Sequence, residues 1–184
     1  MKDDIKKVLF SQEEISAKVH ELGARITADY QGKFPLLVGI LKGSTIFMSD
    51  LARSISLPCE FDFMKVSSYG SGTKTTGAVQ ILMDINCDIA GRDVIIVEDI
   101  LDSGLTLSYL MAQLKTRKPA SLKICTMLEK PDRHVVNIPI DYLGFKVEDV
   151  FVVGYGLDYD GIYRNLPYIG ELKEVIYSKG DESK

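Results

Sequence analysis

The sequence has no apolar run that approaches the ~20 residues a membrane-spanning helix needs. Its first residues, Met-Lys-Asp-Asp-Ile-Lys-Lys, lack the apolar centre of a signal peptide, so we expect a cytoplasmic protein. Basic residues are fewer than acidic ones: the chain has 22 Lys and Arg and 26 Asp and Glu, which gives a net charge of −4. A nucleic-acid-binding surface is normally basic. Neither nucleic acid nor a membrane is therefore an expected partner.

Cysteine and histidine are also scarce. The cysteines, Cys59, Cys87 and Cys125, are an odd number at wide spacings and form no metal-binding pattern. We expect reduced, mostly buried thiols, as in cytoplasmic proteins. His20 and His134 do not pair with a Cys or Ser in a nucleophile pattern, so neither is assigned a catalytic role.

The 184 residues are expected to form one domain (1–184), because no linker or repeat divides them. Apolar runs predict strands at residues 34–41, 59–67, 78–84, 94–97, 121–128, 142–145 and 150–153. One helical pattern follows the capping box Ser11–Glu14, and two others begin at Ile46 and at Leu105. This alternation predicts an α/β fold with a parallel central sheet flanked by helices. The N- and C-terminal segments are expected to form a small cap.

The most informative stretch runs from Val94 to Thr106. Its apolar start reads as a buried strand that ends in Glu98 and Asp99, and Asp102 then opens the turn 102–106 before a helix. Free backbone N–H groups and the helix dipole favour an anion at such a turn. The pattern predicts a cradle for a phosphate monoester, beside carboxylates that suit a polyhydroxylated, metal-bound group. The alternative is an ordinary strand followed by a helix-capping Asp or Ser.

This stretch closely resembles the 5-phosphoribosyl-1-pyrophosphate (PRPP) binding motif of the type I phosphoribosyltransferases. Further segments resemble the hypoxanthine-guanine phosphoribosyltransferases: Leu41-Lys42-Gly43, Ser68-Tyr69, Lys130, and Phe151-Val152-Val153-Gly154-Tyr155 with Asp158 and Arg164. The resemblance covers roughly residues 5 to 178. It implies the type I phosphoribosyltransferase fold, with a parallel sheet, a small hood and a flexible hairpin lid.

The implied activity is Mg²⁺-dependent transfer of 5-phosphoribose from PRPP to N9 of hypoxanthine or guanine, a step of purine salvage. Inosine or guanosine monophosphate and pyrophosphate are the implied products. The family also implies a homodimer or homotetramer.

The resemblance gives the polar residues and the turn of the 98–106 stretch their roles. Glu98 and Asp99 meet the ribose hydroxyls directly or through Mg²⁺, and the 5-phosphate binds at Asp102, Ser103, Gly104, Leu105 and Thr106. Asp102 is the candidate general base, placed to take the proton from N7 of the purine. The simpler readings are a solvated acid pair at a strand end and an N-cap aspartate.

The pyrophosphate is assigned to Lys42 and Gly43, to Ser68 and Tyr69 of a lid over residues 68–77, and to Arg164. The family usually has a non-proline cis peptide at the first loop, so we predict one between Leu41 and Lys42. Ser44 stands where family members often have a second glycine. Each of these assignments has a simpler interpretation. Lys42 could be a lysine at a helix N-terminus, residues 68–77 a long hairpin loop, and Arg164 part of a surface salt bridge.

The purine is assigned to Lys130, Phe151, Val152 and Asp158. Lys130 matches the lysine that donates to O6, Phe151 matches the stacking aromatic, and Val152 and Asp158 read the base through backbone groups. Asp158 is also a candidate Mg²⁺ ligand with Glu98 and Asp99. A sheet-core role for Phe151 is a strong alternative, and Arg133, although close to Lys130, is assigned no role.

Two other functions compete with this interpretation. A sister enzyme could prefer xanthine or adenine, although Lys130 is a donor only and argues against adenine. A regulator on the same fold would sense PRPP without turnover, but it would normally carry a basic face or an extra nucleic-acid-binding domain.

Overall fold

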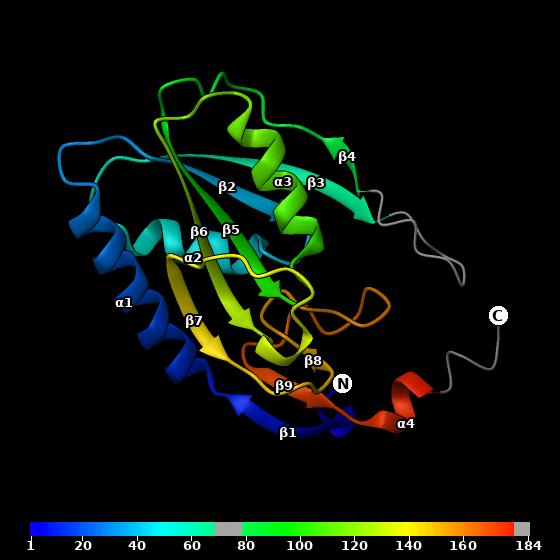
Figure 1. Cartoon of the computed structure of the whole chain (residues 1–184). Coiled ribbons are helices and arrows are strands. Elements are labelled where there is room, and N and C mark those ends of the chain that lie inside the picture. The colour runs from blue at the N-terminus through cyan, green and yellow to red at the C-terminus, as the bar shows by residue number, and fades with distance from the viewer. Residues whose placement is uncertain (69–78, 179–184) are drawn as a thin grey trace.

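The computed structural model describes residues 1–68 and 79–178, with the side chain of Ser68 excepted (Figure 1). Its larger sheet has six strands in the order β4-β3-β2-β5-β6-β7. The parallel strands are β2 (Leu36–Leu41), β3 (Glu60–Ser68), β5 (Asp93–Leu101), β6 (Ser121–Glu129) and β7 (Tyr142–Lys146). Strand β4 (Val79–Met83) pairs antiparallel with β3 at the edge. The predicted parallel central sheet is confirmed, with one antiparallel edge strand added.

Helices cover both faces of this sheet. Helices α1 (Gln12–Asp29) and α2 (Thr45–Ser54) lie on one face, and α3 (Leu105–Lys115) lies on the other (Figure 1). Strand β5 shows why both faces are apolar: Ile95 and Val97 pack in the core with α1 and α2, whereas Val94 and Ile96 pack in the core with α3. A strand buried on both faces needs a continuous apolar run, and residues 94–97 supply it.

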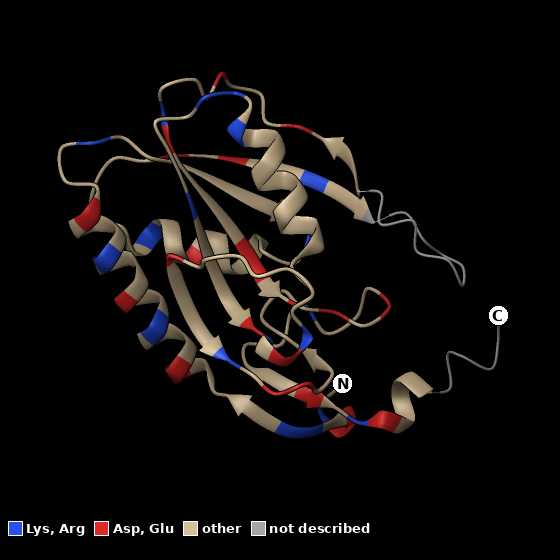
Figure 2. Ribbon diagram, viewed as in Figure 1, with Lys and Arg blue, Asp and Glu red and all other residues tan. Residues whose placement is uncertain are grey.

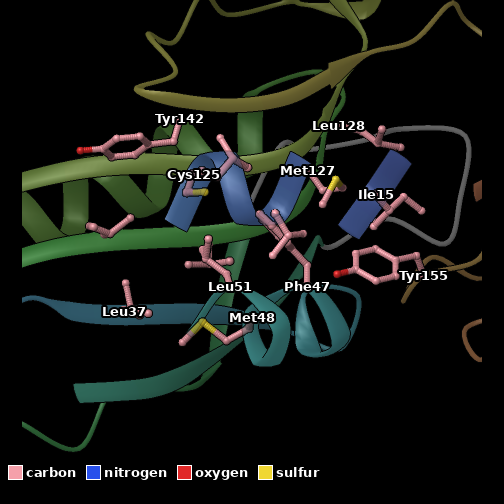
Figure 3. Packing of buried hydrophobic residues seen from close by; sticks show 14 of the residues in the cluster. Ile15, Leu37, Phe47, Met48, Leu51, Cys125, Met127, Leu128, Tyr142 and Tyr155 are labelled. Atoms are coloured by element: carbon pink, nitrogen blue, oxygen red, sulfur yellow. The ribbon is translucent and has the colours of Figure 1, made fainter. Parts of the chain in front are cut away.

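The core beneath α2 is tightly filled. Figure 3 shows Phe47, Met48 and Leu51 of α2 packed among residues from the neighbouring strands. The predicted capping box of α1 is confirmed, because the Glu14 N–H donates to Ser11 Oγ at 3.2 Å and the Ser11 N–H donates to Glu14 Oε2 at 2.8 Å.

The predicted burial of the cysteines is only partly met. Cys125 on β6 is buried, whereas Cys59 and Cys87 are half-buried. The difference follows from position, because Cys59 precedes β3 and Cys87 lies in the connection before β5.

A smaller antiparallel sheet lies beyond the carboxyl ends of β5, β6 and β7 (Figure 1). Its order is β1-β9-β8, made from β1 (Ile5–Phe10), β8 (Val152–Val153) and β9 (Ile169–Leu172), and α4 (Glu174–Tyr177) follows β9. This sheet is the predicted cap. Only residues 152–153 of the predicted 150–153 strand pair as a strand. Strands β1 and β9 were not predicted, because β1 is largely exposed and β9 is only four residues long.

The helices give no sign of a membrane span. Within residues 1–68 and 79–178, none combines the length and the apolar character that crossing a bilayer would take.

Candidate active site

The polar residues predicted as a site follow neighbouring strands of the larger sheet. Lys42, Asp102 and Lys130 come directly after β2, β5 and β6, whose carboxyl ends share one edge. The Lys130 N–H donates to the Leu101 carbonyl at 2.9 Å, so Asp102 and Lys130 leave adjacent strands side by side. Figure 2 shows acidic segments toward these ends of β5 and β6, on the side of the small sheet. Ligands of open α/β sheets bind at such an edge.

The acid pair at the end of β5 is strongly perturbed. Glu98 Oε2 is buried and has no hydrogen-bond partner among the described residues. Burial, together with the neighbouring Asp99, raises the pKa of Glu98 well above its ordinary value. Burial also raises the pKa of Asp99 to about 6, although its Oδ1 accepts a hydrogen bond from the Ile100 N–H at 2.9 Å. A buried acid pair with one oxygen left without a partner suits a cation or ligand hydroxyls.

The turn 102–106 has the conformation expected of an anion cradle. Gly104 adopts φ 81° directly before α3, and the Leu105 N–H donates to Ser103 Oγ at 3.4 Å. A Cβ on Gly104 would approach the Val136 carbonyl oxygen to 2.7 Å, so both the conformation and the space favour glycine. The Ser103 carbonyl accepts hydrogen bonds from Val135 and Val136 N–H, which fixes the turn against the segment after β6. The next N–H groups of α3, which have no partner within the helix, can meet a ligand.

The loop after β2 packs directly on the acid pair. The predicted cis peptide between Leu41 and Lys42 is confirmed. A Cβ on Gly43 would overlap the Asp99 carboxylate, and a Cβ on Gly156 would overlap the Gly43 carbonyl oxygen. Ser44 is buried and donates from Oγ to the Ile40 carbonyl at 2.6 Å, so the serine helps to hold the loop. Lys42, at the start of this loop, is exposed.

A second polar pair lies beside the same loop. Arg164 contacts Asp158 Oδ1 through Nη2 at 2.7 Å and donates from Nη1 to the Gly156 carbonyl at 2.6 Å. Asp158 Oδ2 accepts a hydrogen bond from the Gly161 N–H at 2.8 Å. Gly156 touches Gly43, so Arg164 and Asp158 stand next to the predicted pyrophosphate loop. The charge of Arg164 lowers the pKa of Asp99, although less than burial raises it.

The predicted purine residues come from β6, β8 and the segments beside them. Lys130 is only 7% exposed, and its Nζ lies 3.5 Å from Asp149 Oδ1. Phe151 stacks on Tyr177 with ring centroids 4.9 Å apart, so one of its faces already packs in the cap. Val152 is buried in β8, where only its backbone is available to a ligand at the sheet edge.

Two charged residues that carried no predicted role also lie at this edge. Arg133 Nε is 2.7 Å from Asp102 Oδ1, and Arg133 Nη1 is 3.3 Å from Asp149 Oδ1. The only sequence signal for Arg133 is its position three residues after Lys130, and Asp149 has none. Their contacts arise from the turn after β6 and the loop after β7.

The predicted lid lies outside the described residues. Tyr69 belongs to residues 69–78, and Ser68 is placed only as the last backbone position of β3. The structure also contains a cleft of about 500 Å³ between α1, α2 and residues 165–167. That cleft is lined by none of the predicted site residues, so the strand-end edge remains the candidate site.

Comparison with known proteins agrees with this geometry. The model of the phosphoribosyl transferase domain family matches residues 7–160. A hypoxanthine-guanine phosphoribosyltransferase of Bacillus subtilis is 55% identical over 96% of this chain and 98% of its own length. The chain belongs to the hypoxanthine-guanine phosphoribosyltransferase family. It is thus a glycosyltransferase of purine salvage.

Further relatives extend this likeness to solved structures. A Streptococcus thermophilus member is 54% identical over 97% of this chain and 99% of its own. A crystal structure of a hypoxanthine phosphoribosyltransferase from Staphylococcus aureus superposes with a TM-score of 0.93 at 52% identity, and 96% of each chain is covered. The type I phosphoribosyltransferase fold is therefore confirmed at the level of the whole architecture.

The acid pair of this phosphoribosyltransferase predicts a pH-dependent stability. In the folded protein Asp99 keeps its proton up to about pH 6, whereas an unfolded aspartate releases it near ~3.9. Between these values the folded state binds more protons, so the free energy of unfolding falls as pH rises. We expect ligand-free Asp99→Asn to lose less thermal stability between pH 4.5 and 6.5 than the parent protein does.

Thermal midpoints of both proteins at the two pH values measure this difference. Groups outside the acid pair titrate equally in both proteins, so the comparison isolates Asp99 together with its effect on Glu98. An identical pH dependence in the two proteins would show that the Asp99 carboxyl is not held protonated.

Proposed function

We propose that the chain transfers 5-phosphoribose from PRPP to N9 of hypoxanthine or guanine at the edge formed by β2, β5 and β6. The observation that carries this proposal is the pairing of Asp102 with Lys130 on adjacent strand ends. The N7 and O6 atoms of a 6-oxopurine share one edge of the base. A carboxylate can accept a proton from N7, while an ammonium donates to O6 beside it.

The remaining residues divide the two substrates between them. The 5-phosphate binds to the backbone N–H groups and hydroxyls of residues 102–106, and the ribose hydroxyls bind to Glu98 and Asp99. The pyrophosphate binds to the Lys42–Gly43 loop and Arg164, with Ser68 and Tyr69 as further contacts. Phe151 stacks on the purine, and Val152 and Asp158 read the other edge of the base through backbone groups.

Magnesium fits the acid pair. A partnerless Glu98 oxygen beside Asp99 is the kind of oxygen donor that Mg²⁺ prefers. Within residues 1–68 and 79–178, no group of three or more His, Cys, Asp or Glu side chains converges. That agrees with Mg²⁺, which typically takes one or two carboxylates and completes its shell with water and substrate phosphates. Asp158 would join only by leaving Arg164 and the Gly161 N–H.

The chemistry of the chain's own residues follows from these positions. Asp102 removes the N7 proton, which makes N9 a better nucleophile for C1 of the ribose. Lys42 and Arg164 stabilise the departing pyrophosphate, and bound Mg²⁺ supplies further positive charge there. Positioning and exclusion of water account for the rest, so no covalent enzyme intermediate is required.

The wider setting is part of the same proposal. We infer one phosphoribosyltransferase domain over residues 1–184, working in the cytoplasm as a homodimer or homotetramer. The net charge of −4 argues against a nucleic-acid-binding surface, which is normally basic.

Pyrophosphate release from PRPP and Mg²⁺ tests the proposal directly. We expect turnover with hypoxanthine and guanine, and little or none with adenine. Turnover confined to xanthine or adenine would keep the PRPP site but overturn the assignment of Lys130. PRPP binding without turnover on any base would instead favour a PRPP-sensing regulator.

Lys130→Gln tests how the 6-oxo group is selected. A hydrogen bond from a charged donor contributes roughly 1.5 kcal/mol or more, so kcat/KM for hypoxanthine should fall about tenfold. Gln can also accept a hydrogen bond from an amino group, so discrimination against adenine should narrow. Steady-state rates with both bases measure this ratio, with exposed Lys115→Gln at the end of α3 as the matched control. An unchanged ratio would mean that Lys130 does not read position 6.

A further inference from the structure

A row of four side chains with alternating charge spans the proposed purine edge. Asp102 Oδ1 contacts Arg133 Nε at 2.7 Å, and Arg133 Nη1 contacts Asp149 Oδ1 at 3.3 Å. The same Asp149 oxygen lies 3.5 Å from Lys130 Nζ. The proposed base and the proposed O6 donor are thus joined through two residues to which the reaction assigns no task.

The local fold brings Arg133 back over Asp102. Residues Pro131–Arg133 form a short 3₁₀ turn after β6, and the Arg133 N–H donates to the Lys130 carbonyl at 3.1 Å. This turn reverses the chain just past the strand end. The Arg133 side chain therefore reaches the neighbouring strand end, where Asp102 stands.

An arginine suits this place better than a lysine. Its planar guanidinium presents several nitrogens in a fixed fork, so two carboxylates can be contacted at once, which a single ammonium does poorly. The charge of Asp102, followed by the hydrogen bond to Asp149 and the charge of Asp149, raises the pKa of Arg133, so the guanidinium stays charged. Asp102 Oδ1 has no aligned hydrogen-bond donor among the described residues, so this charge contact is what orients it there.

We propose that Arg133 is a positioning residue for Asp102 and that Asp149 anchors Arg133. The inference rests on the proposed function, in which Asp102 takes the purine proton. Arg133 holds the carboxylate at a fixed angle to the purine edge, and Asp149 sets the angle of Arg133. Because Asp149 also contacts the buried Lys130, one carboxylate fixes the relative placement of the proton acceptor and the O6 donor.

Arg133→Gln is expected to lower kcat about tenfold, because a misplacement of about 1 Å can cost a catalytic group up to ~100-fold. KM for PRPP should stay within about twofold of the parent value, since Arg133 contacts the Asp102 carboxylate rather than the backbone N–H groups and hydroxyls proposed to bind the 5-phosphate. Arg133→Lys keeps the charge but loses the fork, so its kcat should lie between the two. Initial rates at varied PRPP and hypoxanthine give these values.

The decisive comparison places Arg133→Gln in an Asp102→Asn background. If Arg133 acts through Asp102, the second substitution should change kcat by less than about twofold there, since effects in one unit are not additive. Arg117→Gln is the matched control, because Arg117 forms a bidentate pair with Asp84 at the other end of α3. Its kcat should equal that of the parent.

Three results would overturn the inference. These are a parent-like kcat for Arg133→Gln, a full further loss in the Asp102→Asn background, or equal losses for the Gln and Lys variants together with a lowered thermal midpoint. The last would indicate a structural role, which is not expected because the Arg133 and Asp102 side chains are 47% and 45% exposed. A parent protein without turnover would instead refute the proposed function, so the two failures are distinguishable.

Discussion

Asp102→Asn is expected to lower kcat with hypoxanthine by about 10²- to 10³-fold, because a positioned general base contributes on that order. Asn has nearly the shape of Asp, but its neutral amide cannot take the N7 proton. The Asp102 side chain is about half exposed, so the substitution should leave the fold intact. Initial-rate pyrophosphate release at saturating PRPP and hypoxanthine measures the loss, and thermal unfolding checks the fold.

Asp132→Asn is the matched control for this substitution. Asp132 is exposed in the same turn as Arg133, so the change removes one negative charge close to the site without touching the purine edge. Its kcat should remain within about twofold of the parent, as for a screened surface charge. An Asp102→Asn enzyme as active as this control would show that another group takes the purine proton.

The PRPP-like stretch could be predicted because its features are local in sequence. The apolar run 94–97 specifies a strand buried on both faces, and Gly104 permits the left-handed turn before α3. A parallel sheet also places the strand ends before Asp102 and Lys130 at one edge, and the structure shows that these two strands are neighbours. Resemblance to the family supplied what local physics does not, including the cis peptide after Leu41.

Contacts between distant segments could not be predicted in the same way. Strands β1 and β9 pair across most of the chain, with Lys6 and Glu171 in an ion pair of 2.7 Å, and neither strand has a strong pattern of its own. The contact of Arg133 with Asp102 depends on how a short turn folds back. Such contacts are set by tertiary packing, which propensity and periodicity do not encode.

Gly43→Ala is expected to lower kcat/KM for PRPP about 100-fold, the scale of a catalytic geometry displaced by about 1 Å. The added Cβ would overlap the Asp99 carboxylate, and the loop cannot retreat because the Gly43 carbonyl already abuts Gly156. Asp99 must therefore rotate away from the proposed ribose and Mg²⁺ position. A rotated side chain costs far less than a shifted backbone, so activity should be lost with little change in the thermal midpoint.

Gly32→Ala is the control, because it should lower stability without lowering activity. Gly32 adopts φ 74° in the connection after α1, yet a Cβ there meets no atom within 4 Å. Alanine at this position should cost about 1 kcal/mol of stability through its backbone conformation and leave kcat/KM unchanged. If Gly43→Ala instead behaved like Gly32→Ala, the close packing of the β2 loop on Asp99 would not be needed for PRPP use. The acid pair and the pyrophosphate loop would then have to act independently, against the contact that joins them.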